Sequence, residues 1–223
     1  MTDTDWQAAT DPTPMLEYLR GKASDRKLRL FAVACCRRVG DYLEGAGVRH
    51  ALEMAERFAE GLTSRVQLRE ALASALEGSA SPSGASPAAY ASQAARYAGD
   101  SSAWRAAEGA ARLAQLAACP ARRVARGERE LARRGQAELL RDVFGNPFRP
   151  RTGIERAVRA WDGGAVGKIA AAIYDGRHFQ ELPILADALE DAGCTSVEIL
   201  AHCRTGEEHV RGCWAVDCIL GKG

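Results

Sequence analysis

The sequence has few aromatic residues and almost no net charge. Phe, Trp and Tyr make up 6% of the 223 residues, and 30 basic side chains against 29 acidic ones leave a formal net charge of +1. Strands favour aromatic and β-branched side chains, so this composition argues against a sheet. A net charge near zero gives the chain as a whole no electrostatic attraction to nucleic acid or to a membrane surface.

Long apolar runs and a secretory signal are also missing. No stretch reaches the roughly 20 apolar residues that a membrane helix needs, and the first residues are polar and acidic. The seven cysteines are odd in number and include the adjacent pair Cys35 and Cys36, which does not suit a disulfide framework. We therefore expect reduced thiols, a cytoplasmic location and no membrane partner.

Motifs of common enzyme classes are absent as well. The sequence contains no glycine-rich phosphate loop, no G-x-S-x-G and no H-E-x-x-H. The four histidines, at positions 50, 178, 202 and 209, are scattered. A protein without enzymatic activity is the expectation, and the alternative is a thiol enzyme that pairs Cys194 with His202 or His209 as its base.

Helix-forming residues, in contrast, are abundant. Ala, Leu and Arg are frequent, and apolar side chains recur every third or fourth residue in several segments. Ser24 can cap a helix that runs to Leu43, and Ser64 with Gln67 forms a capping box for another helix. No segment shows the alternation of a strand. The sequence predicts an all-α fold, an irregular bundle of about nine helices with no significant sheet.

Glycine and proline divide this helical sequence. We expect residues 1–223 to form a single helical domain, with a flexible Gly/Ser/Pro loop at 78–87. Residues 145–150, Gly-Asn-Pro-Phe-Arg-Pro, predict a rigid non-helical connector, because a residue that precedes proline avoids the α conformation. This connector leads to a C-terminal helical subdomain, residues 161–223.

Charge is distributed unevenly along the chain. Residues 120–159 contain eleven arginines and five acidic residues, whereas residues 175–223 carry a net charge of −5. The arginine-rich helix expected at 120–144 provides a candidate interaction surface on one side, made of Arg122, Arg126, Arg129 and Arg133. Another protein is the expected partner. Nucleic acid is the alternative, because arginines neutralise phosphates, but no aromatic stacking residues accompany this row.

The C-terminal region concentrates cysteine and histidine. Thr195-x-x-Glu198 and Thr205-x-x-Glu208 are capping boxes that predict two short helices, the second of which runs to about Leu220. His209 and Cys213 are four residues apart on that last expected helix, so their side chains would face the same side. Because zinc binds thiolate and imidazole, the candidate metal ligands are Cys194, His202, Cys203, His209 and Cys213.

Three interpretations of this region stay open. Cysteine is often a buried apolar residue, so packing in a core is the leading interpretation, and it requires no cofactor. Zinc binding is an alternative, although no C-x-x-C pair of the kind common in structural zinc sites occurs. Use of one thiol in redox or nucleophilic chemistry is the third.

Three stretches of the sequence resemble an uncharacterised bacterial family of small helical proteins. They are DPTPMLEYLRGKASDRKLRLFAVACCRR near the start, LLRDVFGNPFRP at the connector, and LPILADALEDAGC, ILAHCR and HVRGCWAVDCILGK at the end. Members carry these blocks around a variable Ala-rich middle. The resemblance implies no activity, cofactor or residue role, but it implies that the first and last blocks belong to one unit.

The functional expectation rests on the surfaces of the expected helices, because the sequence shows no set of catalytic residues. We expect a non-enzymatic interaction or adaptor module. A nucleic-acid-binding protein that uses residues 120–144, and a zinc-stabilised or thiol-active domain that uses the C-terminal Cys and His residues, are the alternatives.

Overall fold

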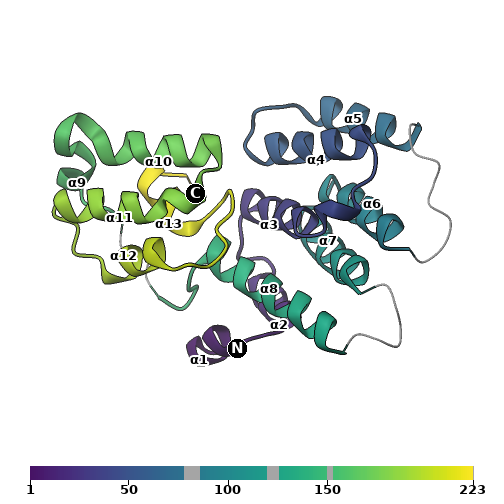
Figure 1. Ribbon diagram of the computed structural model, residues 1–223, viewed down its shortest axis with the longest axis horizontal. Coiled ribbons are helices and arrows are strands. Elements are labelled where there is room, and N and C mark those ends of the chain that lie inside the picture. Colours follow the sequence, from purple (N-terminus) through teal and green to yellow (C-terminus); the bar gives the residue numbers. More distant parts are fainter. Residues whose placement is uncertain (78–85, 120–125, 150–152, 223) are drawn as a thin grey trace. The chain divides into compact units, whose positions relative to one another are not determined.

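The computed structural model describes residues 1–77, 86–119, 126–149 and 153–222 (Figure 1). These residues form helices and contain no strand, which confirms the all-α class. The α-helices are α1 (Asp3–Ala8), α2 (Pro12–Leu19), α3 (Asp25–Arg37), α4 (Ala46–Ala59), α5 (Arg65–Glu77), α6 (Pro87–Ala98), α7 (Ala103–Ala118), α8 (Arg126–Phe144), α9 (Arg156–Ala160), α10 (Ala165–Gly176), α11 (Leu182–Asp191), α12 (Val197–Arg204) and α13 (Trp214–Leu220). Short 3-10 helices cover Gly40–Tyr42, Trp161–Gly164 and Phe179–Glu181.

The described residues form thirteen α-helices, more than the roughly nine that the sequence predicted. Helices as short as α1 and α9, with six and five residues, cannot display an apolar period and were therefore missed. Within the described part of the chain, no helix combines the length and apolarity needed to cross a membrane.

The chain divides into two compact units, Met1 with Ala8–Leu140, and Thr2–Gln7 with Arg141–Gly223. The boundary falls within α8, so the last turn of this helix belongs to the second unit. The second unit therefore begins earlier than residue 161, where we expected a subdomain to start. A single domain over residues 1–223 stays a prediction.

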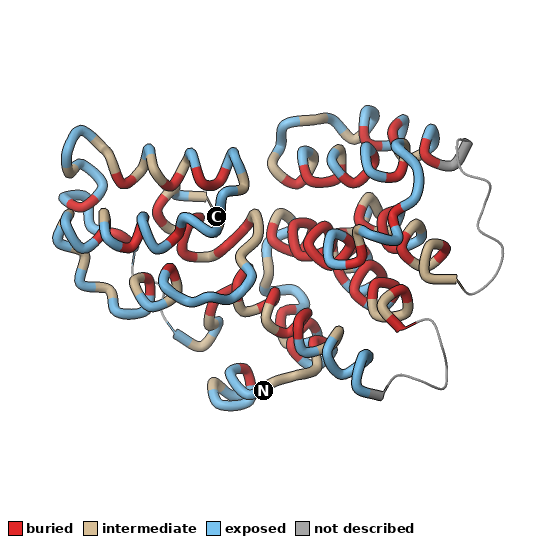
Figure 2. The backbone as a smooth tube through the Cα atoms, in the orientation of Figure 1, coloured by how far each residue is buried: buried red, intermediate tan, exposed pale blue. Residues whose placement is uncertain are grey.

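Small side chains allow close helix packing in the first unit. Helix α3 and much of α7 are buried (Figure 2), and most of the buried residues of α6 and α7 are alanines. Larger side chains, such as Phe31 and Leu30 of α3, fill the remaining space and are almost completely buried. An alanine surface lets helix backbones approach closely, so few bulky residues are needed for a dense core.

Hydroxyl side chains start several helices of the first unit as the sequence predicted. Ser24 caps α3 by accepting the N–H of Lys27. At α5, the Oγ of Ser64 accepts the N–H of Gln67 at 3.2 Å, while the side-chain oxygen of Gln67 accepts the N–H of Ser64 at 2.9 Å. These reciprocal bonds confirm the capping box. Helix α3 ends at Arg37 and not at residue 43, and the 3-10 turn Gly40–Tyr42 follows it.

The segments at 78–87 and 120–144 lie partly outside the described residues. Residues 78–85 of the expected loop are not described, and Ser86 and Pro87 form the cap and first turn of α6. The arginine-rich helix is described from residue 126 and continues without interruption to Phe144.

The second unit has its own apolar core, formed by helices α9 to α13. Leu182, Leu185, Leu189 and Ile173 lie at its centre and are at most 1% exposed. Residues 145–149 of the expected connector are not helical. Gly145, with φ of +61°, follows α8 directly, and a side-chain Cβ at this position would lie 3.0 Å from the indole of Trp214. Glycine at this position therefore allows both the left-handed backbone and the close indole contact.

The end of the chain differs from the prediction. The capping box at Thr205 was wrong, because residues 205–213 form no helix and α13 begins only at Trp214. Thr205 instead ends α12, where its hydroxyl donates to the carbonyl oxygen of His202 at 2.9 Å. The N-cap of α12 is Ser196 and not Thr195, and Ser196 makes no side-chain capping bond, so the box at Thr195 was also wrong.

Candidate metal centre

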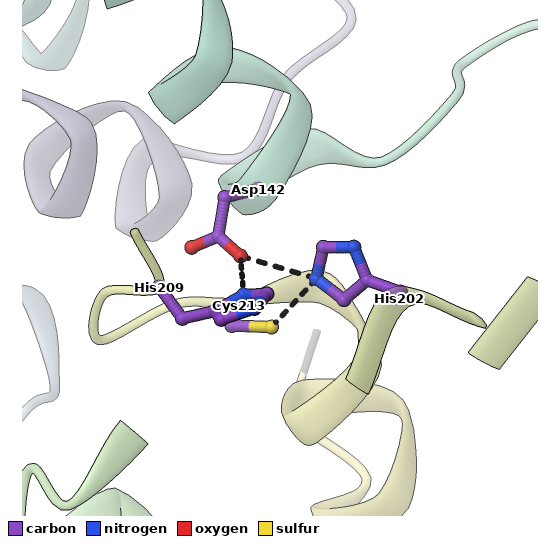
Figure 3. A group of neighbouring side chains, drawn as sticks. All are labelled: Asp142, His202, His209 and Cys213. Carbon is purple, nitrogen blue, oxygen red and sulfur yellow. Dashed lines mark hydrogen bonds and ion pairs between the residues drawn. The ribbon is translucent and has the colours of Figure 1, made fainter. Parts of the chain in front are cut away.

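Four side chains of the second unit direct their donor atoms toward one another (Figure 3). Asp142 comes from the last turn of α8, His202 from α12, and His209 and Cys213 from the segment between α12 and α13. One carboxylate oxygen, two imidazole nitrogens and one sulfur all lie within 4.8 Å of one another. In the described part of the chain, no other group of three or more His, Cys, Asp or Glu residues has this geometry.

Asp142 is the residue that the two histidines share. Its side chain is 4% exposed, and its Oδ1 lies 2.7 Å from His209 Nδ1 and 3.1 Å from His202 Nε2. Its Oδ2 accepts the backbone N–H of Val210 at 2.9 Å. The hydrogen bond from the backbone of Val210 therefore fixes one carboxylate oxygen and leaves the other directed at the histidines.

The Nε2 of His202 has two close neighbours. It lies 3.1 Å from the Oδ1 of Asp142 and 3.2 Å from the Sγ of Cys213. One imidazole nitrogen carries either a proton or a lone pair, so it cannot make a good hydrogen bond to both atoms. A cation between these atoms would satisfy all of them at once, because each can offer a lone pair.

Thr205 fixes the protonation of His209. The Thr205 hydroxyl gives its one proton to the carbonyl of His202, so at 3.3 Å from the Nε2 of His209 it can only accept a hydrogen bond. The Nε2 of His209 must therefore carry a proton, and the Nδ1 is the atom directed at Asp142. Metal-binding histidines commonly donate from their second nitrogen in this way.

Burial and charge act in opposite directions on these groups. Burial alone would raise the pKa of Asp142, but hydrogen bonds and charges from His202 and His209 outweigh it and lower that pKa. Burial would also lower the pKa of His209, and the contact with Asp142 reverses the effect, so the pKa is raised. Both shifts thus favour the ionised form of Asp142 and the protonated form of His209.

The thiol of Cys213 is held in its neutral form. The residue is 0% exposed, and burial, followed by the negative charge of Asp142, raises the pKa of the thiol well above its ordinary value. A metal ion reverses this preference because it coordinates the thiolate and releases the proton.

A polar pocket of about 420 Å³ borders the cluster on one side. Asp142 and His202 line it, together with Arg141, Arg149 and Trp214 among others. The His202 side chain, 14% exposed, is more accessible than those of Asp142 and His209, each 4% exposed. Two of the four residues of the cluster therefore border this pocket.

Arg149 is held in place in the lining of this pocket by two ion pairs. Its guanidinium pairs with Asp3 at 3.2 Å and with Glu198 at 2.9 Å. Asp3 also accepts a hydrogen bond from the side chain of Asn146 at 2.7 Å. The connector after α8 is thus joined to α1 and α12 within the second unit.

Three of the five predicted ligands belong to the cluster, namely His202, His209 and Cys213. Cys203 lies in the apolar core instead, where burial raises the pKa of its thiol to about 12. Cys194 is partly buried beside the same core and is not a member of the cluster.

Asp142 was not predicted as a ligand. It lies 60 residues before His202 and 67 before His209 in the sequence, and nothing local distinguishes it from other carboxylates on a helix. The available signal was its position in the last turn of α8, where the helix dipole disfavours negative charge, so that a buried carboxylate needs a cationic partner.

The predicted arginine surface is only partly described. Arg129 is exposed, and Arg133 pairs with Asp11 at 2.7 Å within the first unit. Arg122 and the side chain of Arg126 lie outside the described residues. An interaction surface made of these four arginines stays a prediction.

Comparisons with protein-family models, with curated proteins and with solved structures find no match to this chain. The resemblance to an uncharacterised bacterial family therefore stays a prediction that these comparisons do not test.

Proposed function

We propose that this protein is a non-enzymatic helical interaction module whose second unit is stabilised by one zinc ion. The observation that carries this proposal is the convergence of the Asp142, His202, His209 and Cys213 donor atoms within 4.8 Å. An ion bound to all four would join the end of α8, helix α12 and the segment before α13. Helices as short as α12 and α13, with eight and seven residues, are marginal in water when isolated, so the ion would add to the support that they receive from the apolar core of the second unit.

The chemistry and spacing of the donors support zinc. Zinc takes imidazole nitrogen, thiolate sulfur and carboxylate oxygen at about 2.0–2.3 Å in a tetrahedron, which places neighbouring ligand atoms roughly 3.3–3.7 Å apart. The closest pairs here are 2.7, 3.1 and 3.2 Å apart, and no pair exceeds 4.8 Å. Displacements of about 1 Å or less per donor atom would complete the tetrahedron.

The number of protein ligands supports a structural ion. Structural zinc sites are closed by four protein ligands, whereas catalytic sites keep one position for water. The cluster supplies four donors, and its most accessible side chain, His202, is only 14% exposed. Little space is left at the ion for a substrate.

A thiol enzyme is less well supported by the same residues. A catalytic cysteine needs a lowered pKa and access to substrate, and Cys213 is completely buried with a raised pKa. In a catalytic triad the carboxylate orients the base through the nitrogen that does not face the nucleophile. Here Asp142 and Cys213 both approach the Nε2 of His202.

Metal analysis tests the zinc part of the proposal. We expect protein purified without chelator to contain about one zinc ion per chain, and cobalt to replace it with tetrahedral coordination. The cobalt complex should show a thiolate charge-transfer band that Cys213→Ser removes. Cys194→Ser is the matched control, because Cys194 lies outside the cluster and the band should persist.

Substoichiometric metal in the wild type, or a charge-transfer band that survives Cys213→Ser, would contradict zinc binding at this cluster. The interaction part needs a separate measurement, in which the zinc-loaded protein serves as bait in affinity capture. Absence of any reproducible protein partner would count against it, and a gel shift at low salt would favour the nucleic-acid alternative instead.

A further inference from the structure

A groove of about 540 Å³ lies in the first unit between α5 and the second half of α6. Each helix contributes residues at positions i, i+3 and i+4, which share one helix face. The lining residues are Arg69, Leu72 and Ala73 of α5, Gln93, Arg96 and Tyr97 of α6, and Asp100. Apolar atoms of the leucine, the alanine and the tyrosine ring are therefore flanked by charged side chains.

Contacts at one end of the groove hold the two helices in place. Gly99 leaves room for Leu72, whose Cδ1 would lie only 2.5 Å from a Cβ at that position. Arg65, at the start of α5, donates to the carbonyl oxygen of Ser101 at 3.2 Å and stacks on the ring of Phe58 at 5.1 Å. The groove is thus shaped before any ligand arrives, which lowers the entropic cost of binding.

The two arginines of the groove are available for a ligand. Among the described residues, no hydrogen-bond or ion-pair partner is found for the guanidinium group of Arg69 or of Arg96. The one carboxylate of the lining is already engaged, since Asp100 accepts the N–H of Ser102 at 2.8 Å and pairs with Arg105 at 3.5 Å. The groove therefore offers two guanidinium groups and no free carboxylate.

We infer that this groove binds an amphipathic monocarboxylate, with the carboxylate on Arg69 and Arg96 and the apolar body on Leu72 and Tyr97. A guanidinium binds a planar carboxylate through paired N–H donors. The volume falls in the range of pockets for small organic ligands. This site is independent of the zinc proposal, because all of its residues belong to the first unit.

Titration of the full-length protein with hexanoate, followed by NMR amide shifts, tests the inference. We expect saturable shifts at Leu72, Ala73 and Tyr97, and weaker binding of acetate, which lacks the apolar body, and of hexanamide, which lacks the charge. Arg69→Gln and Arg96→Gln should each weaken hexanoate binding about tenfold, because a charge-assisted hydrogen bond is lost.

Arg112→Gln is the matched control, since Arg112 is an exposed arginine of α7 outside the groove. Its hexanoate affinity should equal that of the wild type, and thermal melts verify that each variant is folded. A loss in at least one groove variant, with the control unchanged, supports the site. No saturable binding, an affinity for hexanamide equal to that for hexanoate, or wild-type hexanoate affinity in both groove variants would overturn it.

Discussion

Asp142 controls the charge of the cluster because it is a buried carboxylate at the end of a helix. A carboxylate in the last turn of α8 is disfavoured by the helix dipole and by burial. The hydrogen bonds from Val210, His202 and His209 offset both effects. In the metal-free protein this residue is therefore a structural group, and with an ion it becomes a ligand.

We expect Asp142→Asn to destabilise the metal-free protein by about 3 kcal/mol, because one partner of a buried pair is removed. The pKa of His209 is raised by Asp142, so its stabilisation is complete below the ordinary histidine pKa and is lost as pH rises through the raised value. The pKa of Asp142 is lowered, so its contribution is present above the ordinary aspartate pKa. The loss should therefore be greatest at about pH 5.5.

Urea unfolding with chelator present, at several pH values, measures this difference. Asp187→Asn is the control, since the side chain of Asp187 is 72% exposed and little stability should be lost. A loss for Asp142→Asn that grows from pH 6 to pH 8 would contradict the role assigned to His209.

Thr205 matters through its hydroxyl, which accepts the Nε2 proton of His209. We expect Thr205→Val to weaken zinc binding about 10-fold to 100-fold, because the valine has the same shape but cannot hold the ring. Thr205→Ser keeps the hydroxyl and should restore most of the affinity. Nitrogen-15 shifts of the His209 ring report the protonated nitrogen directly, and unchanged shifts and affinity in Thr205→Val would rule this role out.

At the scale of elements, α8 contains a glycine, Gly135, and a side chain of α3 occupies the space beside it. Arg38 of α3 donates to the carbonyl oxygen of Gly135 at 3.0 Å, and a Cβ on Gly135 would collide with its guanidinium. Glycine normally weakens a helix interior by about 1 kcal/mol relative to alanine. Here an added Cβ would displace the guanidinium of Arg38 and break its hydrogen bond to the carbonyl oxygen of Gly135.

Gly135→Ala should therefore give no net gain in the stability of the first unit, although the same change stabilises most helices by about 1 kcal/mol, because the lost hydrogen bond contributes about as much. Gly127→Ala on the same helix is the matched control, because no heavy atom of its surroundings lies within 4 Å of a Cβ there. Thermal unfolding compares the two variants. A stabilised Gly135→Ala protein would show that Arg38 can move away without cost.

The capping boxes show where local sequence succeeds and where it fails. Ser64 and Gln67 precede an apolar helical run, and both reciprocal bonds form. Thr205 and Glu208 have the same spacing, but Asp142 takes the N–H of Val210 and keeps this segment out of a helix. A distant side chain therefore overrode a local signal.

At the scale of the whole molecule, the two units should respond differently to zinc. The four candidate ligands all lie in the second unit, so removal of the ion should loosen that unit alone. We expect a chelator to speed amide hydrogen exchange in α12 and in residues 205–213, and to leave α3 and α7 unchanged. Equal acceleration in both units would contradict a local role for the ion.

Zinc affinity should also decrease as the pH is lowered. Cys213 and His209 must lose protons to bind the ion, and the pKa values of both are raised. Titration in weak buffer should show proton release on zinc addition, and Cys213→Ser should reduce the number of protons released. An affinity independent of pH between about 6 and 8 would exclude the thiolate as a ligand.

The sequence alone determined the helical class and the starts of α3 and α5, because apolar periodicity and capping depend on neighbours in the chain. It also identified the C-terminal Cys and His residues as candidate ligands. It could not predict that Asp142 joins His202, His209 and Cys213, nor exclude Cys194 and Cys203. The contacts of Asp142 join residues 60 and 67 positions apart, and the exclusion of Cys194 and Cys203 depends on how the apolar core packs. Only the tertiary structure brings Asp142 to the histidines, because helix packing places the end of α8 beside the segment that follows α12.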